Sequence, residues 1–530
     1  MAESKKVNHG KKRKKRSVYQ ERLINKNKRK IFTKKLSFTL LFGFVYLITS
    51  IILTVSIWYS CTFDITFNDL LFTMLSSLEG TGESTLSQIF GACTPPVIIS
   101  LAAYVAIVII LWKDTPKKKL LRRIGKIICL FALCCSIIFA IFAFRVPEYL
   151  GVTFIPSKIY EEEYVDPETV KITDKDNNAQ NLICIYLESM ETTYASVEDG
   201  GEQPEINYIP NLTAMAEDNI SFSDSEELGG FRSITGTGWT MGALMGTTGG
   251  VPFSLAVFGS KSHNSLGRDG TFANGLTTLG DILAEKGYTQ EFLCGSDASF
   301  AGRDTYFKIH GNYEIFDYNT AIEEKYVNEK YKVWWGIEDQ KLFNIAKKEI
   351  TELANGNKPF NFTMLTVDTH HVGGYRCALC PREYETKLEN VIKCQDRQIA
   401  QFIEWCKKQD FYENTTIVIL GDHPRMDTQL VTHVDFNDRT MYNCFINSAV
   451  TPKSETTMRT YTSLDVFPTL LAAMGFEIEG DKLGLGTNLF SSLPTLCEEK
   501  GDGNGDIGYN WLDEEVSKTS SYYKKNFITK

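Results

Sequence analysis

A threonine stands at the predicted start of a helix in the segment TGTGWTMGALMGTTGG, which covers residues 235–250. Gly236 and Gly238 permit a tight turn, and the residues that follow, 239–245, favour a helix with apolar spacing. Thr240 would lie in the first turn of this helix, where unpaired N–H groups and the helix dipole stabilise an alkoxide and the phosphate it would attack. A glycine-rich turn ahead of a buried helix is the structural alternative, because glycine-rich loops alone are weak signals. We predict that Thr240 is a nucleophile because other reactive residues recur at strand ends along the chain.

Four apolar, strand-like runs elsewhere in the chain end in acidic or imidazole side chains. Because short apolar runs alternate with helical patterns, the sequence predicts an α/β domain with a mainly parallel central sheet flanked by helices. The carboxyl ends of parallel strands meet at one edge of a sheet, which is where ligands bind in such folds. The four runs end, in chain order, at Glu188, at Asp297, at Asp368 with His370 and His371, and at Asp422 with His423.

The Asp422–His423 pair is the strongest of these signals. Gly421 precedes it and permits close backbone approach, and two residues of metal-binding type follow directly after an apolar strand. Glu188 has the alternative role of a carboxylate at a helix N-terminus. A carboxylate, an Asp–His pair and the ionised oxygen of Thr240 would form a mixed oxygen and nitrogen shell for one divalent cation, most suited to Mn²⁺, with Zn²⁺ or Mg²⁺ as alternatives. Such a cation lowers the pKa of a hydroxyl and neutralises charge on phosphorus, so the predicted chemistry is phosphoryl transfer.

The remaining candidates are weighed against ordinary structural roles. His370 and His371 are adjacent at a strand end in a chain with seven histidines, which favours a site over one core imidazole beside one surface imidazole. A histidine beside the metal would protonate the leaving oxygen. Asp297 belongs either to a substrate wall formed with the following SFAGRDTYF or to a solvated loop. Trp334 and Trp335 are more typical of a core than of a sugar-binding platform.

The charge of the chain is unevenly distributed. The formal net charge is −9, yet residues 1–36 contain fifteen Lys and Arg against two Glu, so the remainder is strongly acidic. A basic arm can bind nucleic acid. This arm instead runs directly into an uncharged apolar segment at 38–60, which is long enough to cross a bilayer. We therefore expect the membrane lipid bilayer as a partner and no nucleic acid.

Two further apolar segments, 95–112 and 127–144, are near the short limit for membrane spans, and core helices are the alternative. Six Lys and Arg lie between them at 114–126, whereas the connection at 61–94 is acidic and has neither residue. By the positive-inside rule the N-terminal arm and the 114–126 loop are cytoplasmic, and three spans place the rest of the chain outside. The first segment is too long for a cleaved signal peptide. We expect a multi-pass protein of the cell membrane with an extracytoplasmic domain.

These patterns divide the chain into five parts. They are a basic cytoplasmic arm at 1–36, a membrane domain at 37–145, a connector at 146–180, an extracytoplasmic catalytic domain at 181–495 and a C-terminal tail at 496–530, expected to be flexible.

Three cysteines outside the spans are notable, namely Cys377, Cys380 and Cys394. The spacing of CALC at 377–380 is that of the first half of a zinc site, but no four-ligand set is visible in the sequence. An extracytoplasmic location favours a disulfide instead. The pairing cannot be deduced from spacing.

Together these stretches resemble the phosphoglycerol transferase and lipoteichoic-acid synthase family of the alkaline phosphatase/sulfatase superfamily. The closing YTSLDVFPTLLAAMGFEIEGDKLGLGTNLFS also looks like that family, and the resemblance covers about residues 180–495. It implies an alkaline phosphatase/sulfatase-like fold for the extracytoplasmic domain. The residues that carry it are YLESMETTY with Glu188, GTGWT with Thr240, VDTHH with His370 and His371, and GDH with Asp422 and His423.

The resemblance implies a role for each matched residue. Thr240 would take glycerol phosphate from phosphatidylglycerol as a covalent enzyme intermediate, releasing diacylglycerol, and a hydroxyl on a glycan or lipid-linked sugar would then collect it. His370, or else His371, would contact the transferred phosphate, and Trp335 would line the glycerol pocket. The metal, commonly manganese in this family, would be bound by Glu188, Thr240, Asp422 and His423.

The sequence departs from parts of the family pattern. The polymerising synthases have five spans and this chain has three predicted spans, which fits smaller relatives that decorate a glycan. Phosphoethanolamine transfer and glycerol-phosphate polymerisation are the alternatives within the superfamily. Sulfate ester hydrolysis would need Cys or Ser followed by x-Pro-x-Arg, a motif that does not occur in the chain. A non-catalytic, membrane-tethered binding or sensor protein is the alternative of another class, and the retention of Thr240 with all three metal ligands argues against it.

Overall fold

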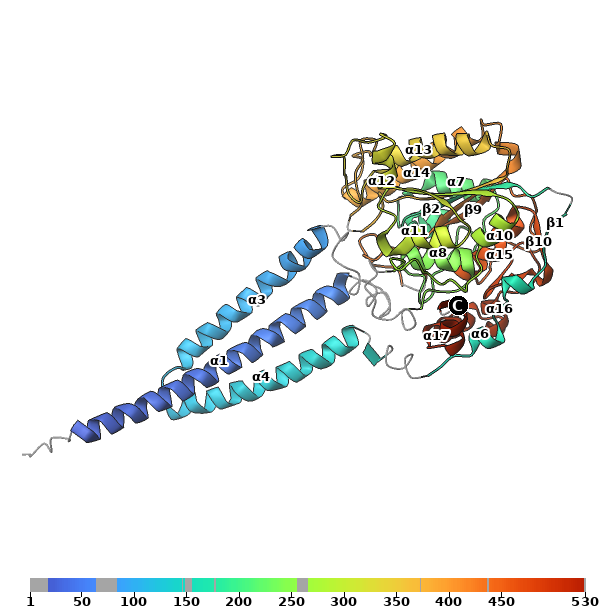
Figure 1. The fold of residues 1–530 in the computed structure, drawn as a ribbon. Helices are drawn as coiled ribbons and strands as arrows, with labels where there is room; N and C mark the ends of the chain where they lie inside the picture. The colour runs from blue at the N-terminus through green and yellow to red at the C-terminus, as the bar shows by residue number, and fades with distance from the viewer. Residues whose placement is uncertain are drawn as a thin grey trace, which may run out of the picture. The chain divides into compact units, whose positions relative to one another are not determined.

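A computed structural model describes residues 18–62, 83–144, 146–147, 155–175, 178–254, 266–371, 373–435 and 438–528 (Figure 1). Residues 1–17 of the predicted basic arm and most of the acidic connection at 61–94 lie outside these described residues. The chain divides into two compact units, one of apolar helices and one that contains the rest of the described chain.

The first unit contains three long helices: α1 (Val18–Thr62), α3 (Glu83–Leu111) and α4 (Pro116–Ala143). All three are long and apolar enough to cross a membrane. α3 begins well before the predicted start at 95, because Pro95 and Pro96 lie inside the helix and not ahead of it. The apolar residues on both sides of this proline pair are helical.

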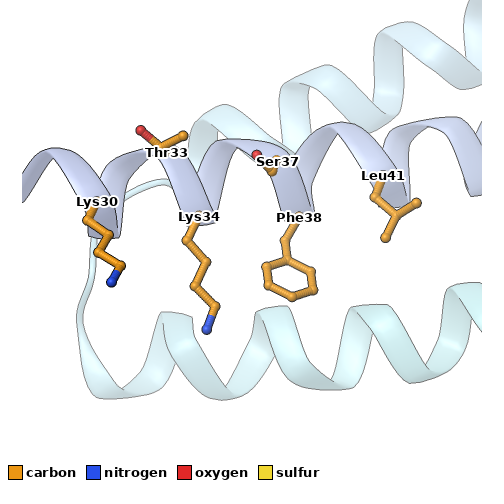
Figure 2. A pocket seen from close by; sticks show the side chains of 6 residues that line it. All are labelled: Lys30, Thr33, Lys34, Ser37, Phe38 and Leu41. Carbon is orange, nitrogen blue, oxygen red and sulfur yellow. The ribbon is translucent and has the colours of Figure 1, made fainter.

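Polar contacts join the ends of these helices. The Asp114 carboxylate, between α3 and α4, accepts from Lys35 of α1 at 2.9 Å and from Arg122 of α4. The Tyr104 hydroxyl donates to the Thr39 carbonyl at 2.7 Å. Figure 2 shows a surface hollow on α1 where its basic N-terminal half meets its apolar half. It is lined by Lys30, Thr33, Lys34, Ser37, Phe38 and Leu41.

The second unit is built on a six-stranded sheet with the order β5-β4-β6-β2-β7-β9. Every neighbouring pair is parallel except β7 with β9, which is antiparallel. The predicted mainly parallel α/β sheet is therefore confirmed, with one antiparallel edge strand added. The strands are β2 (Asn181–Leu187), β4 (Thr289–Cys294), β5 (Glu314–Phe316), β6 (Phe360–Leu365), β7 (Thr415–Gly421) and β9 (Asn443–Ile446).

Helices cover both faces of this sheet (Figure 1). The central strand β2 is buried along its whole length, and its side chains alternate between two apolar cores as the period of a strand requires. Ile183 and Ile185 belong to the core beneath α7 (Pro210–Asp218), α13 (Asp339–Ala354) and α14 (Lys387–Cys406). Leu182 and Cys184 belong to the core on the other face. That face is covered by α8 (Thr240–Gly249), α10 (Leu279–Glu285), α11 (Arg303–Ile309) and α15 (Val466–Ala473).

Smaller elements complete the second unit. Three two-stranded pairs join β1 (Ile172–Asp174) with β10 (Phe476–Ile478), β3 (Phe231–Arg232) with β8 (Thr440–Met441), and β11 (Lys482–Leu483) with β12 (Gly486–Thr487). The short helices are α6 (Ile159–Glu162), α12 (Tyr318–Glu323), α16 (Leu496–Gly501), α17 (Gly505–Ser517) and α18 (Ser521–Tyr523).

Described residues of the predicted connector and of the predicted C-terminal tail pack into the second unit. Within the connector, β1 pairs with β10, and Tyr160 of α6 is 2 % exposed. The Tyr160 ring lies 5.3 Å from the ring of Tyr523 and 5.8 Å from that of Phe527, both in the supposed tail. The Tyr509 hydroxyl of α17 donates to the Ser233 carbonyl at 2.6 Å. Charged residues separate these aromatic residues in the sequence, so the sequence pattern does not indicate that they are buried.

Candidate active site

Two strand ends and one helix start bring four of the predicted residues together. Glu188 follows β2, Asp422 and His423 follow β7, and Thr240 is the first residue of α8. The Thr240 Oγ1 atom lies 3.3 Å from Glu188 Oε2 and 3.3 Å from His423 Nε2. His423 Nε2 lies 3.5 Å from Glu188 Oε1 and 3.4 Å from Asp422 Oδ2. Because β2 and β7 are parallel neighbours, their carboxyl ends place these residues at the same edge of the sheet.

Two glycines make this approach possible. A Cβ atom on Gly421, at the end of β7, would lie 1.9 Å from the Met190 carbonyl oxygen, so the chain that follows Glu188 passes directly against this strand end. Gly236 has a φ of 92°, a conformation that side chains disfavour, and its Cβ would lie 2.5 Å from the Phe253 carbonyl oxygen. The sequence therefore fixes where α8 begins and where β7 meets the turn after β2.

Hydrogen bonds orient the metal-type ligands toward one point. The His423 Nδ1 atom lies 2.9 Å from the Pro424 carbonyl and must donate to it, which leaves the lone pair of Nε2 for a ligand. Asp422 Oδ1 accepts from the backbone N–H groups of Ser189 at 2.7 Å and His423 at 2.9 Å. Among the described residues Asp422 Oδ2 has no hydrogen-bond partner, although it is buried.

This donor set fits one divalent cation. The ligand atoms of Glu188, Asp422 and His423 all lie within 4.8 Å of one another. Their exposed fractions are 2 %, 1 % and 3 %, so a charge placed there would be held in a nearly water-free environment. A buried carboxylate oxygen without a partner is costly unless a cation or proton binds it. Two carboxylates and an imidazole form an oxygen and nitrogen shell of the kind that Mn²⁺, Zn²⁺ or Mg²⁺ accept.

The pKa values of the Glu188 and Asp422 carboxyl groups are shifted by burial and by the charges next to them. Burial, then the nearby Glu188 charge, raises the pKa of Asp422 to about 7. Burial also acts to raise the pKa of Glu188, but the His370 and His423 charges and the Ser189 hydroxyl outweigh it, and this pKa is lowered. The opposite shifts of these two pKa values show that each carboxyl group acts on the other, as expected for two buried acids that share one site.

Thr240 differs from the buried ligands because it is partly exposed. The residue before it, Trp239, adopts an extended conformation and contributes no side-chain hydrogen bond to the N-terminus of α8. The first N–H groups of this ten-residue helix are thus available to an anion, with the positive end of the helix dipole beside them. The hydroxyl oxygen and these N–H groups can meet the same phosphate.

The predicted substrate residues lie together in a row of rings. The ring centroid of His370 lies 4.5 Å from that of His371, and the two rings are stacked. The Trp335 ring lies 4.8 Å from the His370 ring on one side and 5.7 Å from the Phe300 ring on another. Burial lowers the pKa of His370, while the Glu188 charge acts to raise it, which also indicates that this imidazole lies near the metal-type ligands.

Two other predicted strand-end residues lie outside the ligand cluster. Asp297 is exposed, and its Oδ1 atom accepts from the Ser299 N–H at 2.9 Å, as a loop residue does. In the loop that follows Asp297, the Phe300 ring lies against the Trp335 ring. Asp368 is buried, and burial together with the Asp339 charge raises its pKa to about 10. We assign neither carboxyl group to the ligand cluster.

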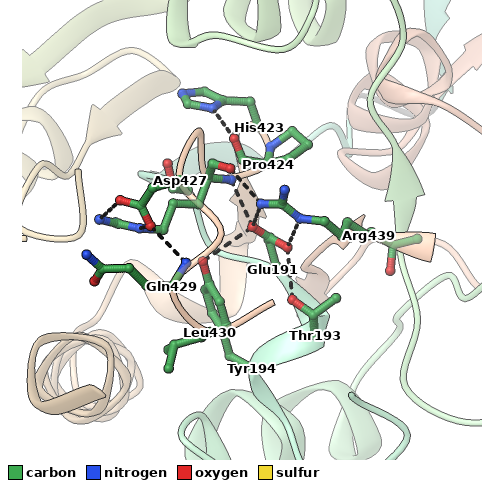
Figure 3. Close-up of polar contacts among 12 residues, drawn as sticks. Glu191, Thr193, Tyr194, His423, Pro424, Asp427, Gln429, Leu430 and Arg439 are labelled. Atoms are coloured by element: carbon green, nitrogen blue, oxygen red, sulfur yellow. Dashed lines mark hydrogen bonds and ion pairs between the residues drawn. The ribbon is translucent and has the colours of Figure 1, made fainter. Parts of the chain in front are cut away.

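Sequence reasoning missed a buried ion-pair network behind the cluster, shown in Figure 3. Glu191 is fully buried and binds Arg439 through both carboxylate oxygens, at 2.9 Å and 2.5 Å. The same carboxylate accepts from the backbone N–H of Arg425 at 2.8 Å, and the Arg425 guanidinium is bidentate to Asp427 at 2.9 Å and 2.8 Å. Glu191 lies three residues after Glu188, so one carboxylate connects the turns that follow β2 and β7.

A second missed residue is Ser189. It has a φ of 51°, in the left-handed region that residues other than glycine rarely adopt. This conformation turns its N–H toward Asp422, and its hydroxyl donates to Glu188 Oε1 at 2.7 Å. A serine directly after a strand gives no signal of this role in the sequence.

The sequence is similar to that of known proteins over more than half of its length. The family model described as Sulfatase matches residues 180–476. A protein of Xanthomonas campestris pv. campestris (strain B100) called phosphoglycerol transferase I is 31% identical over 319 residues, which is 59% of this chain and 43% of that protein. A protein of the same name from Escherichia coli (strain SMS-3-5 / SECEC) is 29% identical over 318 residues, 59% of this chain and 39% of that protein. This chain thus spans less than half the length of these curated relatives.

Among solved structures, the chain is similar to the lipoteichoic acid synthase LtaP from Listeria monocytogenes. The TM-score is 0.47 and the sequence identity 16%, and the match covers 63% of this chain and 82% of that chain.

Proposed function

Because this chain belongs to the sulfatase family, we propose that it is a membrane-anchored, metal-dependent transferase that moves phosphoglycerol from phosphatidylglycerol to a glycan or lipid-linked sugar outside the cytoplasm. The observation that carries the proposal is the position of the Thr240 hydroxyl, 3.3 Å from both Glu188 and His423 at the uncapped N-terminus of α8. The similarity to proteins called phosphoglycerol transferase I supports the choice of transferred group. Thr240 stands in place of the modified nucleophile of sulfate ester hydrolysis, for which the chain lacks the motif.

In the first step, Thr240 Oγ1 forms a bond to the phosphorus of the donor lipid as the bond to the diacylglycerol oxygen breaks. Thr240 Oγ1, which is partly exposed and lies 3.3 Å from Glu188 Oε2, loses its proton to solvent before the attack. The N–H groups at the start of α8 stabilise the negative charge on the phosphate oxygens. The product is a glycerophosphate ester of Thr240 and free diacylglycerol.

His370 is the proposed donor of the proton that diacylglycerol takes up. Burial lowers the pKa of His370 in the protein alone, but a bound phosphate adds negative charge beside it and favours the protonated ring. Trp335, in contact with His370, would pack against the glycerol, and His371 would support the phosphate. In the second step an acceptor hydroxyl attacks phosphorus and gives its proton to His370 as the bond between phosphorus and Thr240 Oγ1 breaks, which regenerates the enzyme.

The metal in this proposal is Mn²⁺, and Glu188, Thr240, Asp422 and His423 would hold it. When bound, a divalent cation supplies a lowered pKa for the threonine hydroxyl and positive charge opposite the phosphate. The three protein ligands other than Thr240 are buried, so they can hold the ion between the two steps.

The proposed topology places the acceptor side of the reaction outside the cytoplasm. Lys30 and Lys34 project at the basic end of α1, and Lys117, Lys118 and Lys119 begin α4. With these ends on the cytoplasmic side, three crossings place the second unit outside. The donor lipid is then in the same membrane as the helices.

Reporter fusions test this orientation. A green fluorescent protein joined after Asp114 is expected to fluoresce, and one joined after Ser157 is expected to be dark, because this reporter does not fold after export through the general secretion route. An alkaline phosphatase reporter should give the opposite pattern. Fluorescence of the Ser157 fusion would refute the extracytoplasmic assignment.

Mass spectrometry of the trapped intermediate tests the chemistry. The full chain in detergent is incubated with Mn²⁺ and phosphatidylglycerol, quenched in acid and digested. We expect a glycerophosphate adduct on the peptide that contains Thr240, and no adduct when a chelator is present. A phosphoethanolamine adduct formed from mixed lipids would retain the mechanism and change the head group. A folded, metal-loaded protein without any adduct would contradict the proposal and favour a binding or sensor protein.

A further inference from the structure

Three cysteine thiols converge between the loop after β6 and helix α14. Cys377 Sγ lies 3.7 Å from Cys380 Sγ and 3.7 Å from Cys394 Sγ, and all three sulfur atoms lie within 4.8 Å of one another. All three are free thiols. Cys377 and Cys380 lie in a tight turn of the loop, where the Cys380 N–H donates to the Cys377 carbonyl at 3.2 Å, and Cys394 lies on α14.

The spacing of the sulfur atoms matches a metal centre. A disulfide bond is about 2.05 Å long and can join only two of the three thiols. A tetrahedral zinc site with Zn–S bonds of about 2.3 Å separates its sulfur atoms by about 3.8 Å. The two distances from Cys377 are those of two edges of such a tetrahedron.

Hydrogen-bond donors lie beside the sulfur atoms of this cluster. The amide nitrogen of Gln398, one turn after Cys394 on α14, lies 3.4 Å from Cys394 Sγ and 4.0 Å from Cys377 Sγ. Donors around the sulfur ligands of a metal stabilise their negative charge and fix their direction.

We propose that Cys377, Cys380 and Cys394 bind one structural Zn²⁺ as three thiolates, with water as the fourth ligand. Three thiols lose their protons to solvent on binding, and no electron is transferred. In the part of the chain that the structure describes, no fourth His, Cys, Asp or Glu joins the group. Water has access beside Cys380, which is partly exposed, whereas Cys377 and Cys394 are 6 % and 1 % exposed.

The position of this centre gives it a role in holding the loop that carries His370 and His371. The loop runs from the end of β6 at Leu365 to the start of α14 at Lys387. The thiols of Cys377 and Cys380 in this loop lie next to the thiol of Cys394 on α14. A metal there would fix the loop to α14 without any contact with substrate. This proposal does not depend on the reaction assigned to Thr240.

Cobalt substitution tests the thiolate centre in the full-length protein in detergent. We expect the unmodified protein, prepared without chelator, to contain zinc, and its cobalt form to show the strong sulfur-to-cobalt charge-transfer absorption that oxygen and nitrogen ligands do not give. The ligand cluster around Asp422 has no sulfur and does not contribute this band. Cys380→Ser should remove the band and one equivalent of metal. Cys406→Ala, a matched change of a buried cysteine on the same helix, should retain both.

Alkylation of the unmodified protein makes the test independent of whether Cys380→Ser folds. The three thiols should resist alkylation until a chelator is added and then react together. A disulfide between any two of them in the non-reduced digest would overturn the proposal. A cobalt form without the charge-transfer band, or thiols whose reactivity ignores the chelator, would overturn it as well.

Discussion

Replacement of Thr240 by alanine is expected to reduce phosphoglycerol transfer by at least about 10³-fold, because loss of a nucleophile removes the covalent step itself. Glu188, Asp422 and His423 remain in the variant, so it should still bind metal, although more weakly. The N-terminus of α8 and the ring residues also remain, and they would still bind phosphate. Diacylglycerol release from labelled phosphatidylglycerol measures the effect.

Thr240→Ser is the matched control for this experiment. Serine keeps a hydroxyl at the same place in the first turn of α8, so measurable transfer and an adduct on the same peptide are expected. Thr240 is partly exposed and the first residue of its helix, and neither change should alter the unfolding transition appreciably. Turnover by the alanine variant at the rate of the unmodified protein would rule out a threonine intermediate.

Replacement of Glu191 by glutamine is expected to lower the free energy of unfolding by about 3–5 kcal/mol. The change keeps the size of the side chain but removes the negative charge opposite Arg439, whose side chain is fully buried. It also weakens the acceptor of the Arg425 N–H, which holds the turn after His423. Since folded domains are commonly stable by only about 5–15 kcal/mol, much of the protein would unfold at moderate denaturant.

Chemical denaturation of the detergent-solubilised protein measures this loss. The matched control is Glu477→Gln, because Glu477 pairs with Lys175 at 3.2 Å on the surface, where the two side chains are 60 % and 67 % exposed. Solvent screens that pair, so its loss should be small. A second variant, Glu191→Leu combined with Arg439→Met, should recover part of the stability because no buried charge is left alone. If Glu191→Gln were as mild as Glu477→Gln, the network would not stabilise the site.

The parts of the fold that follow from local patterns could be predicted from the sequence. The apolar runs that become β2, β4, β6 and β7 are short and are followed by polar side chains, so both the strands and their shared edge were recognisable. Glu188, Asp422 and His423 met because parallel neighbours end together. The small strand β9 was not anticipated, since antiparallel pairing at an edge depends on long-range contacts.

The parts of the fold and of the site that depend on contacts between distant segments could not be predicted from the sequence. Glu191, Arg425 and Arg439 are charged residues in ordinary loop sequence, and charged residues are usually exposed, so only the fold reveals that they are buried together. Asp297 and Asp368 were predicted as site residues because they follow strands, but they lie outside the ligand cluster. The end of a strand determines where such a residue lies and not the direction of its side chain. Cys377 and Cys394 are far enough apart in sequence that their meeting required the geometry of α14.

The packing of Tyr160 against Tyr523 and Phe527 determines where a soluble fragment can be excised for recombinant work. A fragment that begins at Asn181 would leave those two rings without their cover and β10 without β1. One that stops at 495 would also delete Asp513, which accepts from the Thr235 N–H at 2.6 Å, five residues before Thr240. Such truncations would produce aggregation and would disturb the turn before Thr240, and the fragment could then be mistaken for an intrinsically inactive protein. A fragment that covers residues 155–528 keeps the contacts of Tyr160 with Tyr523 and Phe527.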